Sequence, residues 1–263
     1  MKSVVITGSS RGLGLAMAER FLESGCQVTL SGRDEGALLR AKQRFSRFQE
    51  NILTVQCDVQ NRHDVLRLWA EATNRFGKVD IWINNAGINQ PDIHLWEVPP
   101  EDLHSVISTN LIGTIYGSQV AMQGMLRQQN GSIFNMEGFG SNDMQRPGLN
   151  LYGTTKRAVT YFTSALAKEA MGTPIKVCLL SPGMMVTDFV TKTNHVLTDR
   201  ERTRRVFNIL GDKPETVARF LVSKMLDGVR NGERIAWLTK RKAAVRFMTA
   251  SFRKRNLFSD DQL

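Results

Sequence analysis

The fold of this 263-residue chain is decided by its first residues, which read MKSVVITGSSRGLG over positions 1–14. Residues 3–7 form an apolar, β-branched run that predicts a strand, and apolar residues recur at helical spacing over 12–24. Gly8, Gly12 and Gly14 lie at this junction, where glycine lets the backbone approach a ligand closely. The N–H groups at the start of the helix attract anions. The stretch therefore predicts a strand, an anion-binding turn and a helix.

The same alternation continues along the chain. Apolar runs predict six further strands, at 27–31, 51–57, 79–83, 132–136, 175–180 and 234–238. Segments with helical spacing lie between them, at 61–76, 100–128, 151–171 and 214–229. Alternating strands and helices imply a parallel sheet with helices on both faces. We expect an α/β protein with a Rossmann-type, doubly wound sheet of about seven strands in three αβα layers.

Composition and charge favour one domain with an anionic partner. Hydrophobic residues make up 41% and charged residues 23%, as in ordinary globular proteins, and no linker divides the chain. We expect a single dinucleotide-binding domain at 1–239, with a lid at 184–212 and a basic amphipathic tail at 240–263. The net charge is +10, and much of the excess lies in 200–205 and 240–255. A phosphorylated cofactor, an acidic substrate, a membrane or a nucleic acid would match it.

Other classes of protein are disfavoured. No nucleic-acid reader module accompanies the charge, so we expect no nucleic-acid partner. Three cysteines and four histidines show no metal-ligand spacing, so no metal is expected and the cysteines are interpreted as buried and reduced. Met1 leads directly into a strand, and no run of eighteen apolar residues follows. These features predict a cytoplasmic protein.

Five motifs in order resemble the short-chain dehydrogenase/reductase family. They are the TGxxxGxG turn, the NNAG run Asn84 to Gly87, Asn110, the YxxxK pair Tyr152 and Lys156, and PGxxxT at Pro182, Gly183 and Thr187. The resemblance extends over nearly the whole chain. It implies an NAD(P)-dependent oxidoreductase that moves a hydride between the cofactor and a carbonyl or alcohol. It also implies a homodimer or homotetramer built from the helices at 100–128 and 151–171.

Tyr152 and Lys156 are the predicted proton-transfer pair. They are four residues apart in a helix, so both project from one face. An ammonium beside a phenol favours the phenolate, and we expect Lys156 to lower the pKa of Tyr152 toward the working range. The resemblance implies that Lys156 also binds the cofactor ribose and that Asn110 orders a water chain behind it. Alternatively, Asn110 caps or kinks its helix.

The resemblance also assigns the cofactor site. Asp58 and Val59 would contact the adenine, or Asp58 would cap the turn after the third strand. Thr187 would hold the nicotinamide carboxamide. The full set of predicted cofactor-binding residues is Gly8, Ser10, Arg11, Gly12, Leu13, Gly14, Arg33, Asp58, Val59, Asn85, Ala86, Gly87, Tyr152, Lys156, Pro182, Gly183, Met185 and Thr187.

The end of the second strand favours NADP(H) over NAD(H). Gly32 stands where an NAD-specific relative places an acid for the ribose 2′-hydroxyl. Arg33 follows it and Arg11 lies in the glycine turn, so two guanidiniums can converge on a 2′-phosphate. Asp34 is interpreted as a turn or helix-start residue.

The loop after the fifth strand departs from the family pattern. Relatives place a substrate-binding serine where this chain has Gly138, and Ser141 follows three residues later. Either Ser141 replaces that serine as a catalytic residue, or backbone N–H groups of the loop do. The sequence NMEGFGS at 135–141 and the tail resemble the chlorophyll b reductase subfamily, which reduces a formyl group on a chlorin ring. We therefore expect a bulky, lipophilic carbonyl substrate.

Two alternatives remain at the level of sequence. The missing serine is also compatible with an NADP(H)-binding sensor or scaffold without turnover. The tail interleaves basic residues with Val245, Phe247, Met248 and Phe252, so it either lies on an anionic membrane surface or docks on the domain or on a partner subunit.

Overall fold

Seven parallel strands form one sheet in the order β3-β2-β1-β4-β5-β6-β7 in the computed structural model, which describes residues 1–186, 199–250, 252 and 255–258. The strands are β1 (Ser3–Ile6), β2 (Gln27–Gly32), β3 (Ile52–Gln56), β4 (Ile81–Asn84), β5 (Gly131–Met136), β6 (Ile175–Ser181) and β7 (Arg234–Ala236). The winding direction reverses between β1 and β4, and ligands of such sheets bind at the carboxyl ends of the strands around this point. The predicted Rossmann-type fold and its seven strands are confirmed.

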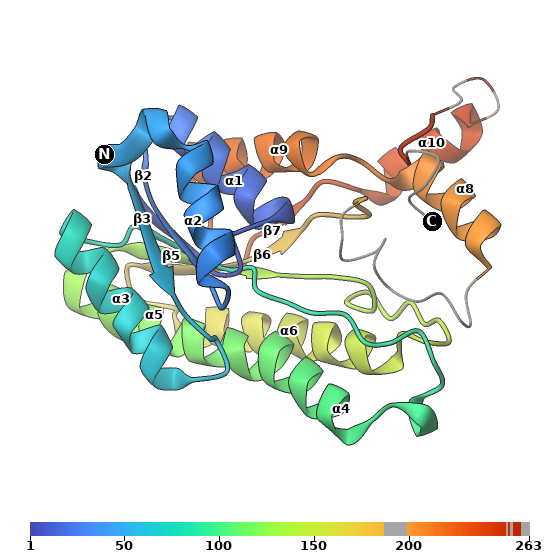
Figure 1. The fold of residues 1–263 in the computed structure, drawn as a ribbon, viewed down its shortest axis with the longest axis horizontal. Coiled ribbons are helices and arrows are strands. Elements are labelled where there is room, and N and C mark those ends of the chain that lie inside the picture. Colours follow the sequence, from blue (N-terminus) through green and yellow to red (C-terminus); the bar gives the residue numbers. More distant parts are fainter. Residues whose placement is uncertain (187–198, 251, 253–254, 259–263) are drawn as a thin grey trace.

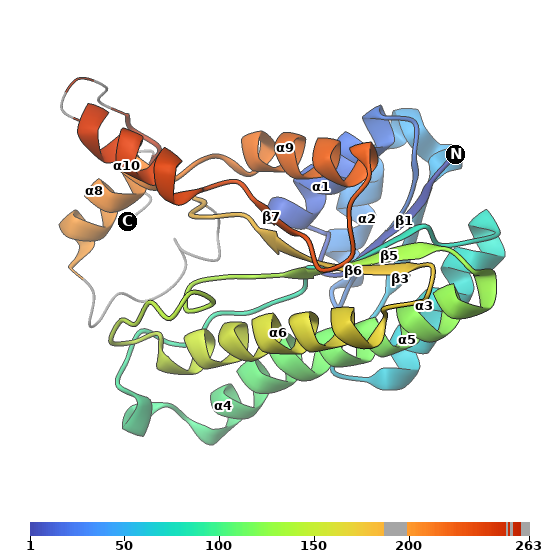
Figure 2. The same ribbon diagram turned by 180° about the vertical axis from the view of Figure 1, so that it is seen from behind.

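Helices cover both faces of the sheet (Figure 1, and from behind in Figure 2). One layer contains α1 (Gly12–Glu23), α2 (Glu35–Arg44) and α9 (Pro214–Asp227). The other contains α3 (Arg62–Phe76), α4 (Pro100–Ile107), α5 (Gly113–Gln128) and α6 (Asn150–Glu169). Outside both layers, α8 (Arg200–Leu210) and α10 (Lys240–Thr249) lie side by side (Figures 1 and 2). Short 3₁₀ turns occur at η1 (Ser46–Asn51) and η2 (Leu95–Glu97).

Each face of the sheet has its own hydrophobic core. On β1, Val4 and Ile6 pack with the α1 and α9 side, whereas Val5 packs with the α3 and α5 side. This alternation follows from the two-residue period of a strand. Because both faces are covered, the central strands are apolar almost throughout.

The predicted helix at 100–128 is interrupted. A π-helical turn, η3 (Ser108–Ile112), separates α4 from α5 and contains Asn110. A π turn inserts an extra residue into the helical repeat, which apolar periodicity alone does not reveal. The helix α2 was not predicted either, because only Leu38 and Ala41 are buried on it and its apolar pattern is short.

Candidate active site

The turn after β1 exposes the start of α1. Gly8 and Gly12 have φ angles of 62° and 57°, a region that favours glycine. A Cβ on Gly14 would lie 2.5 Å from the carbonyl oxygen of Gly8. No side chain caps the N-terminus of α1, and its first turn contains no acidic residue. Its N–H groups thus suit an anion such as the pyrophosphate of a dinucleotide.

The NNAG run fastens this turn to β4. The Thr7 hydroxyl accepts hydrogen bonds from the backbone N–H groups of Asn85 and Ala86, both at 3.0 Å. The Asn85 side chain donates to the carbonyl oxygens of Thr7 and Gly8, both at 2.9 Å. Thr7 was not among the predicted site residues, although its place before Gly8 in the motif was a usable signal. These four hydrogen bonds join the turns after β1 and β4, and we call the joined turns the glycine cradle.

The end of β2 leaves two arginines beside this cradle. The Asp34 carboxylate accepts a hydrogen bond from Ala37 N–H at 2.9 Å and caps α2, which confirms its interpretation as a helix-start residue. Arg11 and Arg33 are exposed, and neither forms an ion pair within the described part of the chain. A Cβ on Gly32 would lie 3.5 Å from the Ser10 hydroxyl. These residues fit a phosphorylated ribose.

Asp58 and Val59 lie beyond β3. The Asp58 carboxylate accepts a hydrogen bond from Gln60 N–H at 3.0 Å, so its side chain supports the local turn. Val59 is buried against α5, where a Cβ on Gly113 would lie 2.7 Å from its Cγ2. The structure thus shows the turn-capping role for Asp58, and its adenine contact stays a prediction.

Asn110, Tyr152 and Lys156 come together at the carboxyl edge of the sheet. The Asn110 carboxamide accepts from Ile88 N–H at 2.8 Å and donates to Ile88 C=O at 2.9 Å. A Cβ on Gly87 would lie 3.3 Å from Asn110 Oδ1 and 3.7 Å from Lys156 Nζ, so both side chains border Gly87. Lys156 donates to the Met136 carbonyl at 3.1 Å. Asn110 therefore both lies in the helical irregularity and holds the loop after β4.

Burial sets the charge states of the pair. Tyr152 and Lys156 are 8% and 4% exposed. Burial raises the pKa of Tyr152 well above its ordinary value, whereas it lowers the pKa of Lys156 to about 8. The prediction that Lys156 brings the pKa of Tyr152 down is therefore wrong for the protein alone, because burial disfavours the phenolate and raises this pKa. Tyr152 is a neutral phenol at neutral pH, which is the form that donates a proton.

The loop after β5 faces this pair without the usual serine. A Cβ on Gly138 would overlap the Tyr152 hydroxyl, so the phenol fills the space beside that residue. The Ser141 hydroxyl accepts from Gly138 N–H at 3.2 Å and donates to Lys156 C=O at 3.3 Å. The Ser141 hydroxyl and the Gly138 N–H are thus engaged with each other, and the hydroxyl is also bonded to α6.

Gln90 was missed by sequence reasoning. It is 2% exposed, and its Oε1 accepts a hydrogen bond from Tyr152 N–H at 2.7 Å, which caps the first turn of α6. The two residues are 62 positions apart, so no local pattern announces the contact. Gln90 fixes the start of the helix that carries Tyr152 and Lys156.

The predicted lid is described in part. Gly183 has a φ of 74°, and Met185 pairs with Asp212 in an isolated β-bridge. Thr187 and the rest of 187–198 lie outside the described residues. Arg246 and Arg255 form ion pairs with the buried Asp212 at 2.7 and 2.9 Å, which join the tail to the segment after α8.

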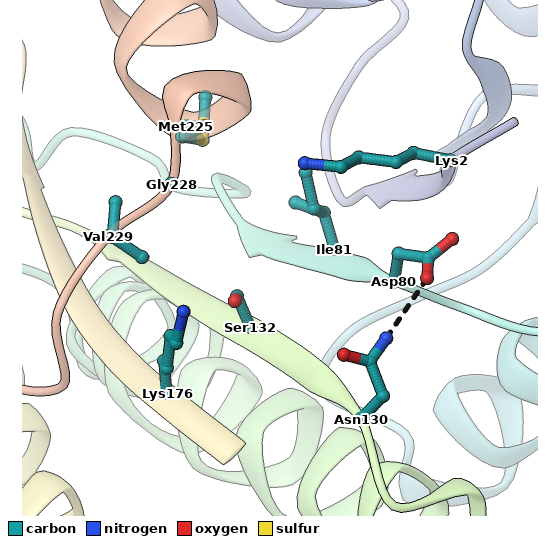
Figure 3. A pocket seen from close by; sticks show the side chains of 9 residues that line it. All are labelled: Lys2, Asp80, Ile81, Asn130, Ser132, Lys176, Met225, Gly228 and Val229. Carbon is teal, nitrogen blue, oxygen red and sulfur yellow. Dashed lines mark hydrogen bonds between the residues drawn. The ribbon is translucent and has the colours of Figure 1, made fainter. Parts of the chain in front are cut away.

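Two hollows lie outside the site just described. One is at the amino ends of the strands and has a volume of about 130 Å³; Figure 3 shows its lining residues Lys2, Asp80, Ile81, Asn130, Ser132, Lys176, Met225, Gly228 and Val229. Ligands of doubly wound sheets bind at the opposite edge. The other, of about 570 Å³, lies between α8 and α10. Among the described residues, no cluster of His, Cys, Asp or Glu suits a metal ion, and the three cysteines are free and buried.

The reversal in sheet order and the glycine cradle define the class of the protein as a doubly wound α/β fold of the dinucleotide-binding type. The chain belongs to the short-chain dehydrogenase family: the model for "short chain dehydrogenase" matches residues 2–197. It is 34% identical to the probable chlorophyll(ide) b reductase NYC1 of Oryza sativa subsp. japonica over 99% of this chain and 54% of that protein. It is 35% identical to the chlorophyll(ide) b reductase NOL of Arabidopsis thaliana over 84% of this chain and 64% of that protein.

A solved structure of ElxO with NADP bound superimposes with a TM-score of 0.79 and 27% identity, over 92% of this chain and 99% of that chain. The chain spans about half the length of the NYC1 proteins that it matches. These similarities confirm the family resemblance and the resemblance to chlorophyll b reductases.

Proposed function

We propose that this protein uses NADPH to reduce a carbonyl group on a bulky, lipophilic substrate, with the formyl group of a chlorin ring as the first candidate. One observation carries the reaction type: a neutral, buried Tyr152 phenol lies over the side-chain-free Gly138, next to Lys156. The similarity to chlorophyll(ide) b reductases over 99% of the chain supports the substrate class.

In this proposal Tyr152 protonates the substrate oxygen. The bound nicotinamide supplies the hydride that reaches the carbonyl carbon. The Tyr152 hydroxyl gives its proton to the oxygen, which becomes the alcohol, and Lys156 stabilises the phenolate that remains. Asn110 and Gln90 keep the surrounding loops in place through their hydrogen bonds to Ile88 and Tyr152. Because Ser141 and Gly138 N–H bond to each other, Tyr152 supplies the main hydrogen bond to the substrate oxygen.

The cofactor preference rests on charge. Asp34 is used as a helix cap, so no described carboxylate at the end of β2 is left for a ribose 2′-hydroxyl. The guanidiniums of Arg11 and Arg33 would bind a 2′-phosphate instead, through charge-assisted hydrogen bonds. This arrangement supports NADP(H) over NAD(H).

The tail supports a peripheral contact with an anionic membrane. On and beside α10, Phe247, Met248 and Phe252 are 52%, 70% and 89% exposed. The helix docks on α8 through Arg246 and leaves these apolar side chains outside. Basic and apolar groups on one exposed helix suit an anionic lipid surface, where a lipophilic substrate would also reside. No described helix is long and apolar enough to cross a membrane. Cytoplasmic location, a homodimer or homotetramer, and the domain boundaries at 239 and 240 stay predictions.

The test is NADPH consumption with carbonyl substrates from small aldehydes to formyl-bearing chlorins. We expect turnover on the large formyl substrates and a loss of about 1,000-fold in Tyr152→Phe, which removes the proton donor. Tyr161→Phe is the matched control, since Tyr161 lies on the same helix and is 78% exposed. NADPH binding should persist in both variants.

The same experiment separates the second candidate, an NADP(H) sensor without turnover. The engaged Ser141 hydroxyl favours that candidate, because no described serine at this loop is left for a substrate oxygen. Tight NADPH binding with no turnover on any carbonyl would support it over the reductase.

A further inference from the structure

A buried carboxylate lies between the backbone contacts of the two catalytic side chains. Glu137 follows Met136, whose carbonyl accepts the hydrogen bond from Lys156, and precedes Gly138, which faces the Tyr152 hydroxyl. The Glu137 side chain is only 2% exposed. It is the acid of the NMEGFGS loop, and the proposed reaction gives it no part.

The carboxylate is held from another strand. Arg234 on β7 donates to Glu137 Oε2 through Nε at 2.8 Å and through a terminal nitrogen at 2.7 Å. Thr160 on α6 donates to Oε1 at 3.4 Å; it lies one turn after Lys156, so the carboxylate reaches the face of α6 that carries Lys156. Arg234 also donates to the Ser181 hydroxyl at 2.9 Å, and its own side chain is 48% exposed. The pair therefore joins the loop after β5 to the far edge of the sheet.

Among the residues that the structure describes, the charges near Lys156 are few. Its own helix contributes Tyr152, which is neutral at neutral pH, and the loop after β5 contributes Glu137. The loop after β4 and η3 contribute Gly87 and Asn110, which carry no charge. Arg234 is paired with Glu137. Glu137 raises the pKa of Lys156 against the lowering by burial, so the two effects oppose each other.

We propose that Glu137 is a positioning residue that keeps Lys156 charged beside Tyr152, and that Arg234 limits this influence by pairing with the same carboxylate. Lys156 must stay protonated to stabilise the phenolate left after proton transfer, and a buried ammonium by itself tends toward the neutral amine. A full negative charge at Glu137 would hold the ammonium too strongly, and the partly exposed Arg234 offsets part of it. The proposal rests on the proposed function for its catalytic meaning, but its electrostatic content stands without turnover.

A purely structural ion pair makes a different prediction. If Glu137 and Arg234 only fastened β7 to the loop, removing either partner would loosen the same contact and disturb Lys156 in the same direction. Under the electrostatic proposal the two removals act in opposite directions. Loss of Glu137 takes away the charge that favours the ammonium, whereas loss of Arg234 leaves that charge unopposed.

The experiment is a pH titration of the full chain labelled with ¹³C-lysine, in which Lys156 is assigned by the spectrum of Lys156→Arg. We expect Glu137→Gln to move the Lys156 midpoint down by about one pH unit and Arg234→Gln to move it up. Glu137→Asp keeps the charge and should give the smaller shift. Glu50→Gln and Arg75→Gln, which break an exposed pair at 3.3 Å, are the matched controls and should leave the midpoint unchanged.

Shifts of the same sign in the two variants, or none in either, would overturn the proposal. If Glu137→Gln does not fold, Glu137→Asp and Arg234→Gln still test the sign. A parallel pH profile of NADPH-dependent reduction should show its alkaline limb moving with the Lys156 midpoint. Opposite midpoint shifts without any turnover would refute the proposed reductase and leave the electrostatic role of Glu137 standing.

Discussion

The turn after β1 and the loop after β5 both end a buried strand at the carboxyl edge of the sheet, yet they are built differently. In the first, the backbone forms the structure: glycines at positive φ and an uncapped helix start present N–H groups that suit an anion. In the second, side chains from distant segments decide the chemistry, with Tyr152 over Gly138 and Arg234 on Glu137. The turn after β1 thus follows a local pattern that many sequences can share. The loop after β5 depends on contacts between segments that lie far apart in the sequence.

The largest effect should come from a substitution in the turn after β1, where the backbone segments are in close contact. In Gly14→Ala the new methyl group would lie 2.5 Å from Gly8 O and 2.6 Å from Asn85 Nδ2. We expect a loss of about 3 kcal/mol in unfolding free energy, because neither neighbour can move without opening the cradle. NADPH affinity should fall by about 100-fold, as measured by fluorescence titration. In Gly153→Ala the methyl group would find an ordinary contact at 3.7 Å, so wild-type affinity is expected. Wild-type stability and wild-type NADPH affinity in Gly14→Ala would contradict the view that close backbone contacts build this turn.

The second largest effect should come from a substitution in the loop after β5, which faces Tyr152. Gly138→Ser restores the residue type of the family pattern, but its Cβ would overlap the Tyr152 hydroxyl. We expect kcat to fall by about 100-fold because the phenol is displaced, while NADPH affinity stays unchanged. Steady-state kinetics with the best carbonyl substrate measure kcat, and a binding titration measures the NADPH affinity. A rise in kcat would mean that Tyr152 moves aside and that the loop accepts the usual serine.

Lys156 is a buried charge beside the loop after β5, and this charge should lower the free energy of unfolding. The pKa of Lys156 is about 8 in the folded chain, below its ordinary value, so the unfolded chain binds more protons between that pH and about 10.4. Stability due to this group therefore rises with pH across the window, and the full penalty applies below it. Lys156→Met should be more stable than the wild type by about 3 kcal/mol near pH 7.

The gain in Lys156→Met should shrink as the pH rises through the same window, as followed by urea unfolding at several pH values. Comparison with the wild type at each pH cancels the contributions of Tyr152 and the cysteines. Lys168→Met changes an exposed lysine of the same helix and should show no such dependence. A pH-independent gain would point to apolar packing instead of charge burial.

The smallest effect should come from removing one arginine at the end of β2, beside the turn after β1. Arg33→Gln removes one guanidinium from the end of β2 and should weaken NADPH binding by about tenfold, the scale of one charge-assisted hydrogen bond. NADH affinity should not change, because it has no 2′-phosphate. Arg44→Gln is the control, since Arg44 is paired with Glu19 on the surface. Equal losses for both cofactors would place Arg33 outside the 2′-phosphate site.

The sequence by itself determined the parts of this protein that depend on neighbouring residues. Alternating strand and helix patterns predicted the seven-stranded sheet, and Gly8, Gly12 and Gly14 predicted the turn, because a two- or 3.6-residue period and a glycine requirement are local properties. The motifs were enough to indicate the family.

Only the tertiary structure decided what joins distant segments. Gln90 meets Tyr152 across 62 positions, and Arg234 meets Glu137 across 97. The direction of the Tyr152 pKa was also beyond the sequence, since it depends on how completely the folded chain removes water from the phenol. Spacing in a helix shows that Tyr152 and Lys156 share a face, but only the packing around them fixes the dielectric in which they titrate.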